Sequence, residues 1–117
     1  MIIGIGCDIV EVKRVGKAME REGFAEKCFL EGEVSSNIRS MAGFFAAKEA
    51  VSKALGTGFS GFSPKDIEVK NEASGKPVVR LHGGAKKLAG NLGVKKISLS
   101  ISHSDNNAIA FAVLEGE

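Results

Sequence analysis

The chain has 117 residues, of which 44% are hydrophobic and 26% are charged, a balance typical of one globular domain spanning residues 1–117. Its net charge of +2 arises from 16 basic and 14 acidic residues, too weak a bias to indicate a nucleic-acid partner. A chain of this length buries one modest core, so a bulky substrate requires a surface cleft or a site between subunits.

The two cysteines, Cys7 and Cys28, belong to no CxxC pair or Cys/His cluster, so we expect no zinc site. The apolar start at residues 1–5 has no basic segment before it and is too short for a signal sequence or a membrane span. Tryptophan and tyrosine are absent, which argues against stacking on nucleic-acid bases. We therefore expect a cytoplasmic protein without a membrane or nucleic-acid partner.

Predicted strands and helices alternate along the chain. Residues 2–10 follow a two-residue period, which predicts a strand with Gly4, Gly6 and Asp8 on one face. Because the two glycines leave that face bare, a ligand or another backbone can approach Asp8. A helix broken near Gly23 is predicted over residues 11–29, and it is followed by irregular structure at residues 31–37.

The strongest helical pattern covers residues 38–55, and the glycines that follow predict its end. Residues 66–70 and 77–81 predict two strands joined by a turn, and residues 84–91 predict a short helix. Two further strands are predicted at residues 96–102 and 108–114. Together these elements predict an α+β fold with a mostly antiparallel sheet.

Asp8 and Glu49 are candidate metal ligands, because Mg²⁺ prefers one or two carboxylates together with substrate phosphates and waters. Lys53 lies one helical turn after Glu49, where it is able to neutralise a phosphate held by the same ion. The structural alternatives are that Asp8 caps the next helix, and that Glu49 and Lys53 form a solvent-exposed pair worth about 0.3–0.5 kcal/mol. Spacing alone favours these alternatives.

His103 continues the apolar face of Ile97, Leu99 and Ile101 at the end of a predicted strand. One interpretation is a half-buried histidine with a backbone partner. The other is an imidazole that positions a phosphate or takes part in proton transfer. The sequence supports both equally.

The segment Gly56-Thr57-Gly58 also has two interpretations: it presents backbone N–H groups to a phosphate, or it simply ends the preceding helix. A basic stripe on the first predicted helix is either a solvated face or a docking surface for an acidic partner. The stripe consists of Arg14, Lys17, Arg21 and Lys27.

Four segments, in order, resemble the motifs of the holo-acyl-carrier-protein synthases, and the run Phe45 to Ala54 is the most specific. The segments are Gly4 to Arg14, Phe45 to Gly58, Gly75-Lys76-Pro77 and Ser100 to Ser104. The resemblance implies a 4′-phosphopantetheinyl transferase fold with a long central helix, assembled as a homotrimer with sites at subunit interfaces. It implies Mg²⁺-dependent transfer of phosphopantetheine from coenzyme A to a serine of apo-acyl carrier protein, in fatty acid biosynthesis.

The resemblance also implies roles for individual residues. Asp8 and Glu49 match the metal-binding carboxylates, and Lys53 matches the lysine beside the transferred phosphate; together these three are the candidate catalytic residues. The proton acceptor stays open among Asp8, Glu49 and a metal-associated water. Positions that match coenzyme-binding segments are Lys53, Gly56, Thr57, Gly58, Pro77, His103 and Ser104. Positions that match the carrier-docking surface are Arg14, Lys17 and Arg21.

The sequence departs from the family at two places. Phe44 stands where the family usually has an arginine, which removes one charge contact with a phosphate or carboxylate. The expected replacement is Lys48 or a residue of another subunit. The segment 31–40 is shorter than usual, so we expect any lid formed there to differ. A non-catalytic coenzyme-binding module and a purely structural subunit are the competing hypotheses.

Overall fold

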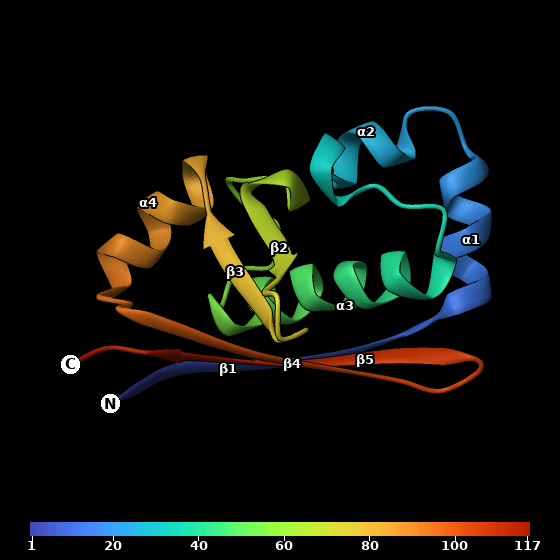
Figure 1. Ribbon diagram of the computed structural model, residues 1–117. Helices are drawn as coiled ribbons and strands as arrows, with labels where there is room; N and C mark the ends of the chain where they lie inside the picture. The colour runs from blue at the N-terminus through green and yellow to red at the C-terminus, as the bar shows by residue number, and fades with distance from the viewer.

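The structure is a computed structural model that describes residues 1–117, and it has an α+β fold. One layer is a three-stranded antiparallel sheet in the order β1 (Ile2–Glu11), β5 (Asn107–Glu115) and β4 (Lys96–His103). The longest helix, α3 (Ile38–Ala54), lies along this sheet, and the other helices lie on the same side of it (Figure 1). The expectation of a long helix packed on an antiparallel sheet is therefore confirmed.

A second, separate sheet pairs β2 (Ile67–Asn71) with β3 (Pro77–Leu81), also antiparallel. The predicted antiparallel strands are therefore divided between two sheets. The reason is α4 (Gly83–Leu92), which connects β3 to β4 and places Ala85 and Ala89 in the core. A hollow of about 370 Å³ lies between β3 and β4, where no hydrogen-bonded ladder connects the two sheets.

Two short helices follow β1: α1 (Val12–Glu20) and α2 (Phe24–Cys28). The predicted break near Gly23 is confirmed, because Gly23 has a φ of 86°, which glycine adopts readily. Glu11, not Asp8, is the N-cap residue of α1, so Asp8 does not cap this helix. The segment predicted to be irregular contains a 3₁₀ turn, η1 (Glu31–Glu33), and a second such turn, η2 (Pro64–Asp66), precedes β2.

Close contact between α3 and β1 organises the core. The buried face of α3 is rich in alanine, and a Cβ atom at Gly6 would collide with the carbonyl oxygen of Ala50. A Cβ atom at Gly4 would likewise collide with the carbonyl oxygen of Ala54. The glycine face of β1 is therefore covered by a helix backbone, which is one of the two outcomes that the sequence allowed.

The opposite face of the β1-β5-β4 sheet is uncovered in the single chain (Figure 1). Ile5, Ile9 and Phe111 are 68%, 62% and 54% exposed, and the register pairs Cys7 with Phe111 between the first two. Such a cluster of large apolar side chains on one face typically marks a contact surface. No helix of the chain is long and apolar enough to cross a membrane.

The contact between β1 and α3 generates a stability prediction. Gly6→Ala should lower the free energy of unfolding by about 2 kcal/mol or more, because the added methyl group must push two backbones apart. Gly90→Ala is the matched control, since Gly90 lies in α4 with open space around its Cα. It should raise the free energy of unfolding by about 0.5–1 kcal/mol. Urea unfolding at one protein concentration measures both, and an unchanged Gly6→Ala midpoint would contradict the proposed contact.

Candidate active site

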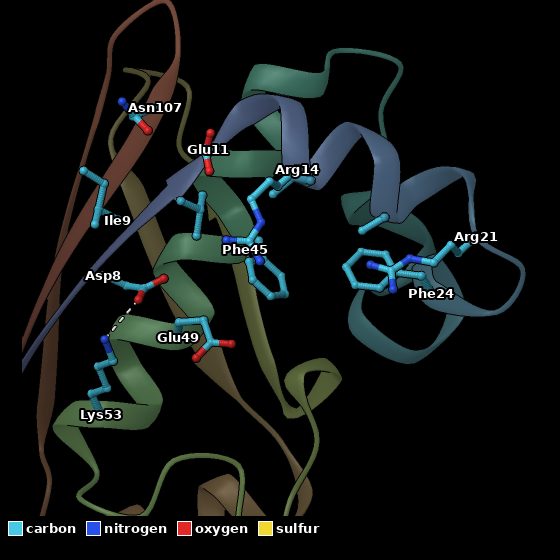
Figure 2. Close-up of a pocket in the computed structure, with 13 residues that line it drawn as sticks. Asp8, Ile9, Glu11, Arg14, Arg21, Phe24, Phe45, Glu49, Lys53 and Asn107 are labelled. Atoms are coloured by element: carbon cyan, nitrogen blue, oxygen red, sulfur yellow. Dashed lines mark hydrogen bonds and ion pairs between the residues drawn. The ribbon is translucent and has the colours of Figure 1, made fainter.

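A pocket of about 700 Å³ lies between β1, the first two helices and α3 (Figure 2). At one end, Asp8 from β1 faces Glu49 and Lys53 from α3. At the other end lie Arg21 and Phe24. The sequence prediction that the three candidate catalytic residues meet is consistent with this arrangement, because β1 and α3 are in direct contact.

Lys53 bridges β1 and α3. Its Nζ atom donates to Asp8 Oδ1 at 3.0 Å and to the Cys7 carbonyl oxygen at 3.0 Å. The alternative in which Lys53 pairs along the helix with Glu49 is therefore wrong: the ion pair is with Asp8. The hydrogen bond from Lys53 to Asp8 raises the pKa of the lysine, so its ammonium stays charged at neutral pH.

Glu49 is half-buried beside this pair. Burial raises its pKa, the nearby charge of Asp8 raises it further, and Lys53 opposes both effects. Two carboxylates that repel each other in a partly enclosed pocket form a site where a cation is stabilised. The chain has no cluster of three or more His, Cys, Asp or Glu side chains able to hold a metal. The pair suits Mg²⁺, which completes its shell with substrate phosphates and waters.

The remaining walls of the pocket combine basic, aromatic and aliphatic side chains with one further carboxylate, that of Glu11. Arg14 lines it from α1, and Phe45 lines it from α3. The rings of Phe24 and Phe45 have centroids 6.0 Å apart, and the Arg21 guanidinium lies 5.9 Å from the centroid of Phe24. The third predicted docking residue, Lys17, is exposed on α1 but does not line the pocket.

Sequence reasoning did not identify the two phenylalanines as site residues. Phe45 fits the apolar helical period of α3, and Phe24 lies in a short helix without any buried residue. A phenylalanine that lines a pocket and one that fills a core give the same pattern in a sequence. Only the tertiary arrangement distinguishes the two cases.

The predicted coenzyme-binding residues near the C-terminus lie elsewhere. His103 donates through Nε2 to the Arg39 carbonyl oxygen at 3.0 Å, so the expected backbone partner is present, although the side chain is exposed. His103 and Pro77 line a second pocket of about 180 Å³ together with Phe44. His103 and Ser104 line a third pocket of about 260 Å³. Within one chain, these residues do not line the first pocket.

The glycine segment that follows α3 terminates this helix. Gly56 and Gly58 have φ angles of 90° and 61°. Their N–H groups donate to the carbonyl oxygens of Lys53 and Ser52, at 3.0 and 3.3 Å. The interpretation of Gly56-Thr57-Gly58 as a helix end therefore accounts for these two N–H groups, and the segment lines none of the three pockets described.

Lys48 does not replace the charge absent at Phe44. It is fully buried, and its Nζ atom binds Glu33 Oε1 at 2.8 Å, so the expectation that Lys48 compensates is wrong. A guanidinium that the sequence did not single out lies beside Ser104, which lines the third pocket. Arg39 Nη2 donates to the Ser104 carbonyl oxygen at 3.2 Å, beside His103.

Comparison with known proteins places this geometry in a family. Residues 4–112 match the 4′-phosphopantetheinyl transferase superfamily. A holo-[acyl-carrier-protein] synthase of Clostridium perfringens is 53% identical, over 100% of this chain and 96% of that protein. Among solved structures, the Plasmodium yoelii acyl carrier protein synthase with ADP bound has 40% identity and a TM-score of 0.90, covering 100% of this chain and 97% of that one.

A holo-(acyl-carrier-protein) synthase from Bacillus anthracis, in complex with CoA (3′,5′-ADP), has 39% identity and a TM-score of 0.82. That match covers 100% of this chain and 99% of the other. Matches of this identity over the full length show that this chain and these relatives share one fold. The chain therefore belongs to the holo-[acyl-carrier-protein] synthase family of the 4′-phosphopantetheinyl transferase superfamily.

Proposed function

We propose that this chain transfers the 4′-phosphopantetheine group of coenzyme A to a serine of apo-acyl carrier protein. The observation that carries the proposal is the convergence of Asp8, Glu49 and Lys53 at one end of a pocket whose other walls include basic and aromatic side chains. Relatives named for this activity, and the Bacillus anthracis relative in complex with CoA (3′,5′-ADP), support it.

The reaction breaks one bond and forms another at a single phosphorus. The serine oxygen attacks the phosphorus that carries the pantetheine arm, and the bond to adenosine 3′,5′-bisphosphate breaks. Such a transfer depends mainly on positioning and on neutralising charge. The ammonium of Lys53 supplies one positive charge beside the phosphates, and the proton of the serine hydroxyl passes to Asp8, Glu49 or a water.

Asp8 and Glu49 are the residues that would hold Mg²⁺. When bound, the ion supplies further neutralisation of phosphate charge. Without it, the two carboxylates would repel the phosphates of the donor, and the single ammonium of Lys53 already pairs with Asp8. The chemistry of the pair therefore favours a divalent cation as part of the working enzyme.

The working unit in this proposal is a homotrimer. The uncovered sheet face with Ile5, Ile9 and Phe111 is the surface through which chains associate, because burying these side chains removes apolar area from water. Association also explains the separation of the site residues. The pocket with Pro77 and His103 of one chain would lie next to the pocket with Asp8 and Glu49 of its neighbour, and the two together would form one complete site.

The acidic carrier protein docks on α1 next to the pocket. Arg14 and Arg21 line the pocket and are exposed, so they can pair with carboxylates while the serine reaches the phosphates. Both cysteines are free, which suits the reducing cytoplasm where fatty acid biosynthesis would use the product.

The direct test of the function is a mass spectrum of an apo-acyl carrier protein after incubation with the purified chain, coenzyme A and Mg²⁺. We expect the carrier to gain one phosphopantetheine group, and we expect chelation of the metal to prevent this. A panel of apo-carriers without any mass gain would overturn the proposal. If coenzyme A bound in calorimetry while no carrier was modified, a non-catalytic binding module would be the better description.

Replacing Glu49 by glutamine should lower the activity and raise the stability of the fold. Glu49→Gln should lower the rate of transfer by about 100-fold or more, because one charged oxygen ligand is lost. The raised pKa of Glu49 means that its ionised form is less favourable in the folded than in the unfolded chain. This free-energy cost is absent at low pH, where Glu49 is protonated in both the folded and the unfolded chain. It grows as pH rises above the pKa that Glu49 has in the unfolded chain, and it is complete above the raised pKa in the folded chain.

Glu49→Gln should therefore unfold at a higher urea concentration than the wild type at pH 7, and this difference should vanish in acid. Glu72→Gln, in the exposed turn between β2 and β3, is the control and should change neither property. A fully active Glu49→Gln variant would remove Glu49 from the reaction.

Association through the sheet face gives a further prediction. Phe111→Glu should convert the trimer to monomers, because a carboxylate at the centre of the apolar face cannot be desolvated cheaply. Activity should fall with the trimer, while the circular dichroism spectrum stays that of the wild type. Leu92→Glu, an exposed apolar position on α4, is the control. Sedimentation velocity measures the mass, and a wild-type chain that sediments as a monomer would refute this assembly.

The two basic residues on α1 should differ in their effect on the carrier. Arg14→Ala should raise the KM for the carrier by about tenfold, because one charge contact at the pocket is lost. Lys17→Ala should change it by about twofold or less, because Lys17 does not line the pocket. Steady-state kinetics at two salt concentrations compare them, and equal effects would show that docking extends over the whole basic face.

A further inference from the structure

A buried ion pair lies beside the pocket but does not line it. Lys48 and Glu33 are 0% and 3% exposed, and their Nζ and Oε1 atoms are 2.8 Å apart. The ammonium also donates to the carbonyl oxygens of Pro64 and Ile67, at 2.9 and 2.6 Å. All three N–H groups of the lysine therefore have acceptors, and each acceptor comes from a different segment.

Glu33 makes matching contacts with backbone donors. Its Oε1 accepts from the Leu30 N–H and its Oε2 from the Val69 N–H, each at 2.8 Å. The pair thus connects η1, α3, η2 and β2. An apolar pair would fill the same space, but it would leave these backbone groups unsatisfied. The hydrogen bonds are directional, so only one placement of the segment around η1 satisfies all of them.

The segment held in this way carries α2. This helix has five residues, none of them buried, and no side-chain cap at its N-terminus. The residue that follows it, Phe29, is buried, and its ring centroid lies 5.5 Å from Lys48 Nζ. Phe29 in turn contacts Phe24 with ring centroids 6.3 Å apart. Phe24 is the pocket residue that contacts Phe45 and Arg21.

We propose that Lys48 and Glu33 are positioning residues for the carrier protein, because they hold α2 where Phe24 and Arg21 form the far wall of the pocket. This inference rests on the proposed function, since it assigns that wall to the carrier and the carboxylate end to the chemistry. Loosening α2 then changes recognition of the carrier but leaves Asp8, Glu49 and Lys53 in place on β1 and α3.

Glu33→Gln tests the proposal, with Glu31→Gln as the matched control, because Glu31 is exposed on the same 3₁₀ turn. We expect Glu33→Gln to raise the KM for the carrier by about tenfold, the scale of a misplaced binding wall. The KM for coenzyme A and kcat should stay within about twofold of the wild type. Glu31→Gln should leave all three unchanged. A fall in kcat at an unchanged carrier KM would overturn the proposal.

The thiol of Cys28, at the end of α2, reports the position of this helix without any enzyme assay. Burial raises its pKa, which makes the thiol slow to react in the wild type. In a Cys7→Ser background, Glu33→Gln should make Cys28 react with a thiol reagent about tenfold faster in the absence of urea, and Glu31→Gln should not. Equal reactivity in the two variants would refute a role in holding α2.

Glu33→Gln leaves a buried ammonium without its partner, so Phe29→Leu serves as a milder second variant that decides the question if the first does not fold. This substitution keeps the ion pair but removes the ring that contacts Phe24. It should raise the KM for the carrier and leave kcat unchanged. An unchanged carrier KM in Phe29→Leu would overturn the proposal. A wild-type chain that modifies no carrier would instead refute the proposed function, and the Cys28 measurement would still test the hold on α2.

Discussion

The close contact between the backbones of β1 and α3 is the constraint on which the site depends. Gly6 lies against the carbonyl oxygen of Ala50, so the strand and the helix approach more closely than side chains would allow. Asp8 follows Gly6 on the same face of β1, and it therefore reaches Lys53 on the next turn of α3. The distance of 3.0 Å between their charged atoms is a consequence of two missing side chains.

This contact also explains the electrostatics of the pocket. Asp8 and Glu49 come from different elements, and their mutual repulsion would drive them apart if the elements were free to move. The packed core prevents this, and the raised pKa of Glu49 reflects its burial and the charge of Asp8. The arrangement lowers the stability of the empty fold while it prepares a site for positive charge. Such conflicts between stability and function are typical of active sites.

A chain of this size does not enclose a large substrate. Its predicted site residues instead lie in separate pockets on the surface. One pocket combines carboxylates with basic and aromatic walls, while His103 and Pro77 line a different pocket. The uncovered apolar face of the sheet includes Ile9, which lines both the first pocket and the pocket beside Ser104. In the proposed trimer, association through this face would bring new surface next to the carboxylates, which is the physical argument for a site shared between chains.

Much of the fold could be predicted from the sequence, because strand and helix periods are local properties. The pattern of residues 2–10 and 38–55 was sufficient for β1 and α3, and the glycines next to Asp8 indicated a close approach. The partner of Lys53 could not be predicted in this way. Its spacing to Glu49 is that of an ordinary helical pair, whereas its ion pair is with Asp8, 45 residues away.

The sequence by itself determined the order of the elements, the family motifs and the residue types that chemistry at a phosphate requires. Only the tertiary structure decided that the strands divide into two sheets, and that Lys48 is buried against Glu33 instead of facing a phosphate. It also decided that Phe24 and Phe45 line a pocket. The physical reason is that periodicity specifies which face of an element is apolar, whereas the partner of that face depends on packing between segments distant in the sequence.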